Sequence, residues 1–203
     1  SLGDSNPWDI TTPVFEETVK AFFPLATWSH LAFNGFLAFW LLQYTDLNAS
    51  VECYVEYEAV IEKEEKEKEK EKRLSRSERS ATRQIEELKK ELKAVQEDEA
   101  RVRSHVAAME PTLKELFEGF FCGSDANACV VDFIQFCLLP RVLTSPMDAL
   151  FCAEFVRALV RWEVKNYNHI LFVKRALTVF LSLLRGVTEN EALNVSIFLL
   201  EVF

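Results

Sequence analysis

This chain contains few of the residues that break helices. Its 203 residues include 5 glycines and 6 prolines, against 17 phenylalanines, and 49% of the chain is hydrophobic. Turn-rich β folds need more glycine and proline, and no long run alternates apolar and polar residues as a half-buried strand does. The chain is long enough to bury a core of its own. We therefore expect an all-α fold of packed helices.

Sequence signs of catalysis and of cofactor or metal binding are equally scarce. The glycines stand singly, so a glycine-rich phosphate loop is missing, and no Cys-x-x-Cys pair occurs. The histidines, His30, His105 and His169, have no nucleophile and carboxylate at a recognisable spacing. We predict that the protein is not an enzyme and needs no cofactor and no metal ion.

Long apolar runs are also missing. The most apolar early run, Leu31–Leu42, is interrupted by Asn34-Gly35 and ends after 12 residues, whereas a membrane-spanning helix needs about 20. The polar start of the chain does not resemble a signal peptide. The 5 cysteines are odd in number, which is typical of free thiols in a reduced intracellular compartment. We expect no membrane association.

Positive charge is not in surplus either. The formal net charge is −9, and binding to a phosphate backbone needs a concentrated face of Lys and Arg. The lysines between Glu62 and Arg73 are balanced by glutamates. That stretch is interpreted as a solvated helix with Glu–Lys pairs, or as a disordered segment. The acidity is interpreted as serving solubility.

What the chain does have is helical periodicity, which divides it into three segments. Residues 1–50 should form two short helices, one closed by Pro24 and one running from about Thr27 or Ser29 to Gln43. The second helix is aromatic on more than one side. Its rings are interpreted as core residues, and an aromatic peptide-binding groove is the alternative; they belong to Trp28, Phe33, Phe36, Phe39 and Trp40.

Residues 51–121 are predicted to form one long, charged coiled-coil helix. A single heptad phase fits from Cys53 to Phe120, with glutamates on the seam in its first part. Pro111 removes a backbone donor, so we expect a kink or a new helix near it. The apolar part should bury its seam against another chain or another helix of this protein. The predicted partner-binding residues there are Ile85, Leu88, Leu92, Val95, Val102, Val106, Met109 and Leu113.

Residues 122–203 are predicted to form helical hairpins. A helix over about Asp125–Leu139 should end at Pro140, and the next should begin at Ser145 as its cap. A third helix is expected over about Asn168–Arg185.

A capping box of Thr188 and Glu191 should start a fourth helix. Helix starts about 20 residues apart give two hairpins with a period near 40, the spacing of HEAT-like repeats. The last helix ends on bare apolar residues, so we expect a truncated array. The predicted architecture is thus a HEAT-like helical-hairpin array with a long coiled-coil arm.

The hairpin around Pro140 also carries a sequence resemblance. Its first helix ends in Leu139-Pro140-Arg141, and after a turn with Thr144 and Ser145 come Asp148-Ala149 and Cys152-Ala153-x-Phe155. A weaker patch upstream consists of Phe39-Trp40, Tyr44, Asp46-Leu47, Tyr57-Glu58 and Ile61. Both patches resemble the family of THO complex subunit 2, the large scaffold subunit of a nuclear assembly that links transcription to mRNA packaging and export.

This resemblance implies a non-enzymatic scaffold in the nuclear THO (TREX) complex. The implied partners are the other THO subunits and a DEAD-box RNA-dependent ATPase, with RNA contacted by other parts of the complex. Arg141, in the motif, is expected either to form a local ion pair or carbonyl cap, or to bind an acidic group of a neighbouring subunit. Beyond the helix of Phe155 the family usually has a longer segment, so this chain is either compacted there or lacks residues.

The predicted coiled coil and helical repeats are also compatible with a second function. Coiled coils and α-solenoids also form cytoplasmic trafficking and tethering adaptors. Co-purification separates the two hypotheses, because mRNA export factors favour the scaffold and membrane-coat or GTPase partners favour the adaptor.

Overall fold

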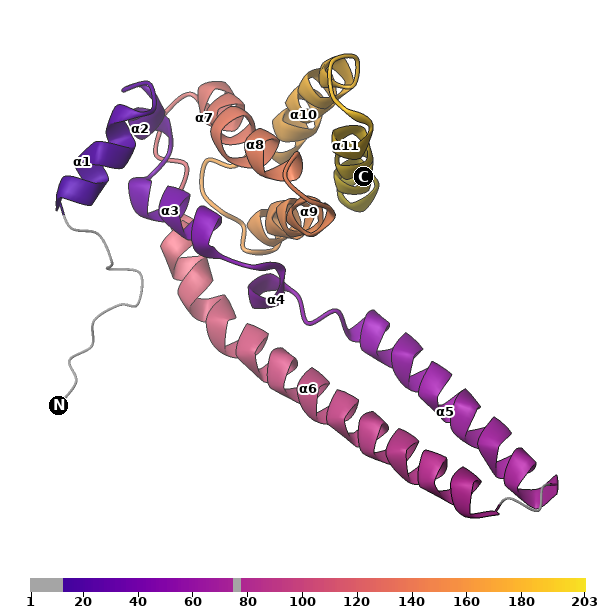
Figure 1. The fold of residues 1–203 in the computed structure, drawn as a ribbon. Helices are drawn as coiled ribbons and strands as arrows, with labels where there is room; N and C mark the ends of the chain where they lie inside the picture. The colour runs from indigo at the N-terminus through magenta and orange to yellow at the C-terminus, as the bar shows by residue number, and fades with distance from the viewer. Residues whose placement is uncertain (1–12, 75–77) are drawn as a thin grey trace, which may run out of the picture. The chain divides into compact units, whose positions relative to one another are not determined.

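A computed structural model describes residues 13–74 and 78–203, with the side chains of residues 15–70 and 82–203. Within these ranges every regular element is a helix (Figure 1). Extended backbone pairs there only in an isolated antiparallel bridge between Leu31 and Phe121. The predicted all-α fold is confirmed, whereas the HEAT-like class and the coiled-coil arm stay predictions.

The internal contacts of the chain form two compact units. The first takes in the described residues up to Leu47 together with Glu110–Phe203, and the second is Asn48–Met109. The sequence suggested three consecutive segments instead. The difference arises because the N-terminal helices pack with the C-terminal hairpins, so the second unit is an insertion within the first.

The first unit contains most of the helices and the core. Besides the end of α6 (Glu78–Glu118), it consists of α1 (Pro13–Ala21), α2 (Thr27–His30), α3 (Phe33–Leu41), α4 (Tyr44–Leu47), α7 (Ala126–Phe133), the π-helical turn η1 (Ile134–Leu138), α8 (Leu139–Val142), α9 (Pro146–Arg161), α10 (His169–Leu183) and α11 (Glu189–Val202).

The helix predicted from Thr27 to Gln43 is split. The backbone N–H of Ala32 donates to the carbonyl of Phe120 at 2.9 Å, and Cys122 donates to the carbonyl of His30 at 3.0 Å. These bonds replace helical bonds around Leu31, so α2 ends before it and α3 starts after it. The bridge fixes α3 against the chain segment that follows α6.

Pro140 does not end its helix, which corrects the prediction. The helical path widens into η1 and then continues through Pro140 in α8. Proline has no N–H to donate and its ring crowds the carbonyl four residues earlier. A π-helical turn changes the hydrogen-bond register at that point, so it accommodates the proline without stopping the chain's helical course.

The hairpins of the first unit stack as pairs. α10 packs on α7, and α11 packs on α9. The predicted caps are present: the Ser145 hydroxyl accepts from the backbone N–H of Asp148 at 3.1 Å, and Thr188 forms a capping box with Glu191. These caps set where α9 and α11 begin, and so set the register of each hairpin.

Phenylalanine rings fill the centre of the first unit. Phe155 of α9 lies 4.9 Å from Phe117 of α6 and 5.0 Å from Phe39 of α3, measured between ring centroids. Phe133 of α7 joins them, and each of these four rings is fully buried. Core packing is therefore the role of Phe39, as interpreted from the sequence, and α3, α6, α7 and α9 are held around one aromatic cluster.

The second unit is a helical hairpin rather than one long helix. Its first helix is α5 (Val51–Leu74), and the second is the first part of α6. The Tyr54 hydroxyl donates to Asp98 at 2.7 Å and the Tyr57 hydroxyl donates to Glu91 at 2.7 Å. Because later residues of α5 meet earlier residues of α6, the two helices run antiparallel. A single straight helix is thereby excluded.

Pro111 lies inside α6, near the boundary of the two units. The helix continues past it to Glu118, so the alternative of a new helix starting there is wrong. Pro111 follows directly after Glu110, where the first unit resumes.

Candidate partner-binding site

The predicted seam of α6 lies beside α5 in the second unit. Ile85 is 8% exposed, and the seam residues after it, which are Leu88, Leu92, Val95, Val102, Val106 and Met109, are half-buried. Lys89 pairs with Glu65 of α5 at 3.2 Å. The sequence left open whether a helix of this chain or another chain meets the seam, and α5 is one helix that does. Binding of a further partner there stays a prediction.

Leu113 has a different environment from the rest of the seam. It belongs to the first unit and has no exposed surface. Periodicity placed it with the partner-binding residues, yet in the structure it is part of the buried core around Phe117. A partner has no access to its side chain.

The phase predicted for α5 is wrong by one residue. Tyr54 and Ile61 lie on the inner face, and Ile61 is 3% exposed. The residues assigned to the seam from the sequence are exposed instead: Cys53, Tyr57 at 48% and Val60 at 51%. The inner face was missed because it includes Glu65, whose charge is balanced by Lys89 across the hairpin.

The hydrogen bonds of Tyr54 and Tyr57 shift the pKa values of the groups that they join. The hydrogen bond to Asp98 raises the pKa of Tyr54 above its ordinary value, and the same bond lowers the pKa of Asp98. The hydrogen bond to Glu91 likewise raises the pKa of Tyr57. These tyrosines therefore hold α5 to α6 as neutral donors to carboxylates.

Arg141 is buried within the first unit, with a side chain 9% exposed. Its Nε lies 3.0 Å from Asp148 Oδ1, its Nη2 donates to the carbonyl of Leu42 at 2.7 Å, and its Nη1 donates to the carbonyl of Phe39. The guanidinium also lies 3.6 Å from the ring centroid of Phe151. A cation and donors at the last carbonyls of α3 cap that helix.

The turn between α8 and α9 positions this arginine. Asp148 lies in the first turn of α9, where Ser145 is the cap, and the Ser145 hydroxyl also donates to its Oδ2 at 2.6 Å. A local ion pair was one of the two roles expected for Arg141, and it is present. The carbonyls it binds belong to α3, about a hundred positions earlier in the sequence, and no local pattern pointed to them. Its role toward a partner stays a prediction.

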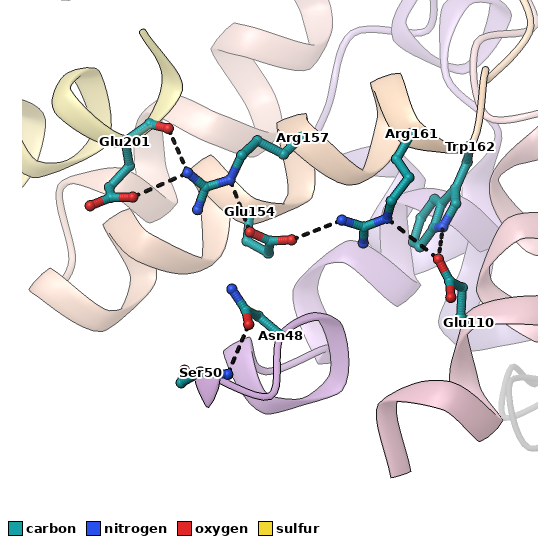
Figure 2. A network of polar contacts seen from close by, with 8 residues as sticks. All are labelled: Asn48, Ser50, Glu110, Glu154, Arg157, Arg161, Trp162 and Glu201. Carbon is teal, nitrogen blue, oxygen red and sulfur yellow. Dashed lines mark hydrogen bonds and ion pairs between the residues drawn. The ribbon is translucent and has the colours of Figure 1, made fainter. Parts of the chain in front are cut away.

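A second polar network ties α9 to its neighbours (Figure 2). Glu154, which is 4% exposed, accepts from Arg157 Nε at 2.9 Å and from Arg161 Nη1 at 3.3 Å. Arg157 also reaches Glu201 of α11 at 3.1 Å, and Arg161 reaches Glu110 of α6 at 3.4 Å. The polar stripe of α9 thus links α6, α9 and α11.

His30 and two buried cysteines of the first unit are likewise held within the fold. His30 Nδ1 lies 2.7 Å from Asp132 Oδ2, which joins α2 to α7. The thiols of Cys137 and Cys152 are buried, and burial raises the pKa of each, which keeps both neutral. Among residues 13–74 and 78–203 no three His, Cys, Asp or Glu side chains gather as a metal site.

The ion pairs and hydrogen bonds described above hold the helices together and leave helix faces open to a binding partner. In the described part of the chain no helix combines the length and apolar character needed to cross a membrane. The features available to a partner are therefore the faces of α5 and α6 in the second unit and the outer faces of the hairpins in the first.

The sequence of this chain is similar to a known protein family. A family model, Tho2, described as "Transcription factor/nuclear export subunit protein 2", matches residues 28–203. Human THO complex subunit 2 is 30% identical over 97 residues, which are 47% of this chain and 6% of that protein.

The similarity extends to plants and fungi. THO complex subunit 2 of Arabidopsis thaliana is 26% identical over 162 residues, 76% of this chain and 9% of that protein. The Saccharomyces cerevisiae protein of the same name is 37% identical over 81 residues, 40% of this chain and 5% of that protein. The matched part thus spans less than a tenth of each of these relatives. No solved structure matches the chain.

Proposed function

This chain belongs to the Tho2 family, and we propose that it acts as a non-enzymatic scaffold segment of the nuclear THO complex. In this role it helps to couple transcription to mRNA packaging and export by holding other subunits in place. The observation that carries the proposal is the family match over residues 28–203. The matched residues include parts of both structural units.

The scaffold proposal is supported by the buried charged side chains, which hold helices together. The buried charge of Arg141 binds the end of α3, and that of Glu154 holds Arg157 and Arg161, which reach α11 and α6. Side chains engaged in this way hold a surface in a fixed form, which is the property that a binding platform needs.

The proposed partners are the other THO subunits and a DEAD-box RNA-dependent ATPase. RNA is proposed to meet other parts of the complex, because the chain has a net charge of −9 and phosphate contacts need clustered cations. The seam of α6 is the proposed contact for a partner helix. Its residues remain half-buried beside α5, so a further helix has apolar surface left to cover.

The test is co-purification of the full-length protein from nuclear extract, with partners identified by mass spectrometry. Leu88→Glu with Leu92→Glu should release a subunit, since two charges would be forced into a half-buried apolar seam. The matched control is Gln84→Glu with Gln96→Glu, which adds the same charge at exposed positions of α6.

Three results would be informative here. Loss of a THO subunit from the leucine variant alone supports the proposed seam. An intact complex in the leucine variant contradicts it. Recovery of membrane-coat or GTPase partners from the unaltered protein, in place of mRNA export factors, would replace the scaffold proposal with the trafficking adaptor.

A further inference from the structure

The helix α5 carries a second apolar face that the hairpin does not cover. Cys53, Tyr57 and Val60 recur at spacings of four and three residues, so they form one row along the helix. Tyr57 is 48% exposed and Val60 51%, whereas Ile61, the next residue in the sequence, is 3% exposed. This row, Cys53-Tyr57-Val60, therefore lies beside the α5–α6 seam and faces outward.

The surroundings of this row are acidic. The stretch Val51–Ile61 contains no lysine or arginine, and its three glutamates are Glu52, Glu56 and Glu58. Glu91 of α6 lies on the same side, because the Tyr57 hydroxyl donates to it at 2.7 Å. Further along α6, the acidic residues Glu97, Asp98 and Glu99 form ion pairs with Lys93, Arg101 and Arg103, so on α6 the acidic surroundings of the row are confined to its end near Glu91. An occupant of the row must therefore tolerate or neutralise the negative charge of Glu52, Glu56, Glu58 and Glu91.

We propose that the row Cys53-Tyr57-Val60 binds an amphipathic helix of another subunit whose apolar stripe is flanked by lysine and arginine. The partner helix would lie along α5 and α6 and complete a three-helix coiled coil. This inference rests on the proposed scaffold function and adds the chemistry of the partner.

The negative charge around the row selects among the possible occupants of this face. A second copy of this chain would set two acidic rows against each other, and a nucleic acid would bring phosphates to glutamates; both contacts are repulsive. A helix flanked by lysine and arginine meets apolar residues in the middle and carboxylates at the edges, as flanking charges do in coiled coils. Because the apolar row is short, the charges should supply much of the selectivity.

The proposal is tested on the full 203-residue chain with two synthetic helices of about 28 residues, or four heptads. Both have leucine at the seam positions. One has lysine at the flanking positions and the other has glutamate. Fluorescence anisotropy of a labelled peptide should show that the lysine peptide binds and that the glutamate peptide does not. Binding should weaken at least about tenfold as salt rises from about 50 to about 500 mM, because screening removes the charge contribution.

Two matched variants locate the contact. Val60→Asp should lower the affinity for the lysine peptide at least about tenfold, or about 1.4 kcal/mol. Val55→Asp is the control, since Val55 is equally exposed at 55% on the same helix but does not share the row. It should change the affinity less than twofold. Neither side chain is buried, so both variants should fold, and circular dichroism checks that they do.

A charge exchange completes the test. Glu56→Lys with Glu64→Lys places cations beside the row, and this variant should bind the glutamate peptide in preference to the lysine peptide. The proposal is overturned if the lysine peptide does not bind, or if Val55→Asp and Val60→Asp weaken it equally. It is also overturned if the chain forms a dimer that Val60→Asp dissociates, because the occupant is then a second copy.

The outcomes also separate this inference from the scaffold function. If the lysine peptide fails to bind while THO subunits still co-purify with the full-length protein, the inference falls and the scaffold function stands. If the peptide binds as expected while no THO subunit co-purifies, the scaffold assignment falls and the basic-helix surface is retained.

Discussion

Replacing Arg141 with methionine should destabilise the first unit by about 3–5 kcal/mol, the usual result of removing one partner from a buried charged pair. The change leaves the carbonyls of Phe39 and Leu42 without their donors. Both residues are at most 1% exposed, and an unsatisfied buried polar group costs about 1–3 kcal/mol. The ion pair with Asp148 is partly exposed and adds less.

Urea unfolding followed by tryptophan fluorescence is the appropriate assay. The tryptophans with described side chains, Trp28, Trp40 and Trp162, belong to the first unit, so their emission reports that unit. With a urea dependence of about 2 kcal/mol per molar, a loss of 4 kcal/mol lowers the midpoint by about 2 M. Arg141→Lys keeps the charge but not the fork of donors, so it should recover only part of this loss.

A change of less than about 1 kcal/mol for Arg141→Met would refute the reasoning, because the loss of two buried donors would then have almost no effect. If the same variant also lost a THO subunit in co-purification, Arg141 would be a partner anchor. Intact partner binding with lowered stability instead assigns it to the cap of α3.

Further predictions concern the core, the α9 network and the last helix. Gly35→Ala should destabilise the protein by about 1–3 kcal/mol in urea unfolding, because the added methyl would lie 2.5 Å from the ring of Phe120, which is fully buried. Glu154→Gln should cost about 1–3 kcal/mol through the loss of a buried charge-assisted acceptor, and hydrogen exchange should show weaker protection in α11. Hydrogen bonds from the backbone N–H and the hydroxyl of Thr188 lower the pKa of Glu191. These bonds to the carboxylate therefore stabilise the fold above the unfolded carboxyl pKa of about 4.3, and their contribution is lost as pH falls through the lower folded pKa. The melting temperature of Glu191→Ala, which removes the carboxylate but keeps the Thr188 cap, should therefore be reduced at pH 7 and approach that of the unaltered protein as pH falls toward about 3; a deficit that is independent of pH would contradict the assignment.

Features that depend on neighbouring residues were predictable from the sequence. Ser145 caps α9 and Thr188 with Glu191 caps α11, as their spacing indicated. Such caps join groups three residues apart, so sequence alone contains the necessary information. The helical class followed in the same way from composition and periodicity.

Features that depend on distant residues were not predictable. Arg141 binds the end of α3, and His30 meets Asp132, each across 102 positions of sequence. The split of the helix predicted from Thr27 depends on a backbone bond that the carbonyl of Phe120 accepts and on another that the N–H of Cys122 donates. No periodicity links these pairs, since they are neighbours only after the helices have packed.

The heptad phase predicted for α5 identified a true row of apolar residues but placed it on the wrong side of the helix. Cys53, Tyr57 and Val60 do share a face, but that face is exposed, while Ile61 is buried beside α6. Periodicity identifies an apolar row and cannot tell whether the row packs inside the chain or against another protein. In α5 the charged residues decide, because Glu65 has Lys89 as its partner across the hairpin, whereas Glu52, Glu56 and Glu58, before Val60, lie in a stretch without lysine or arginine. Apolar spacing together with an unbalanced flanking charge therefore indicates an intermolecular face, and Val60→Asp against Val55→Asp measures whether that reasoning holds.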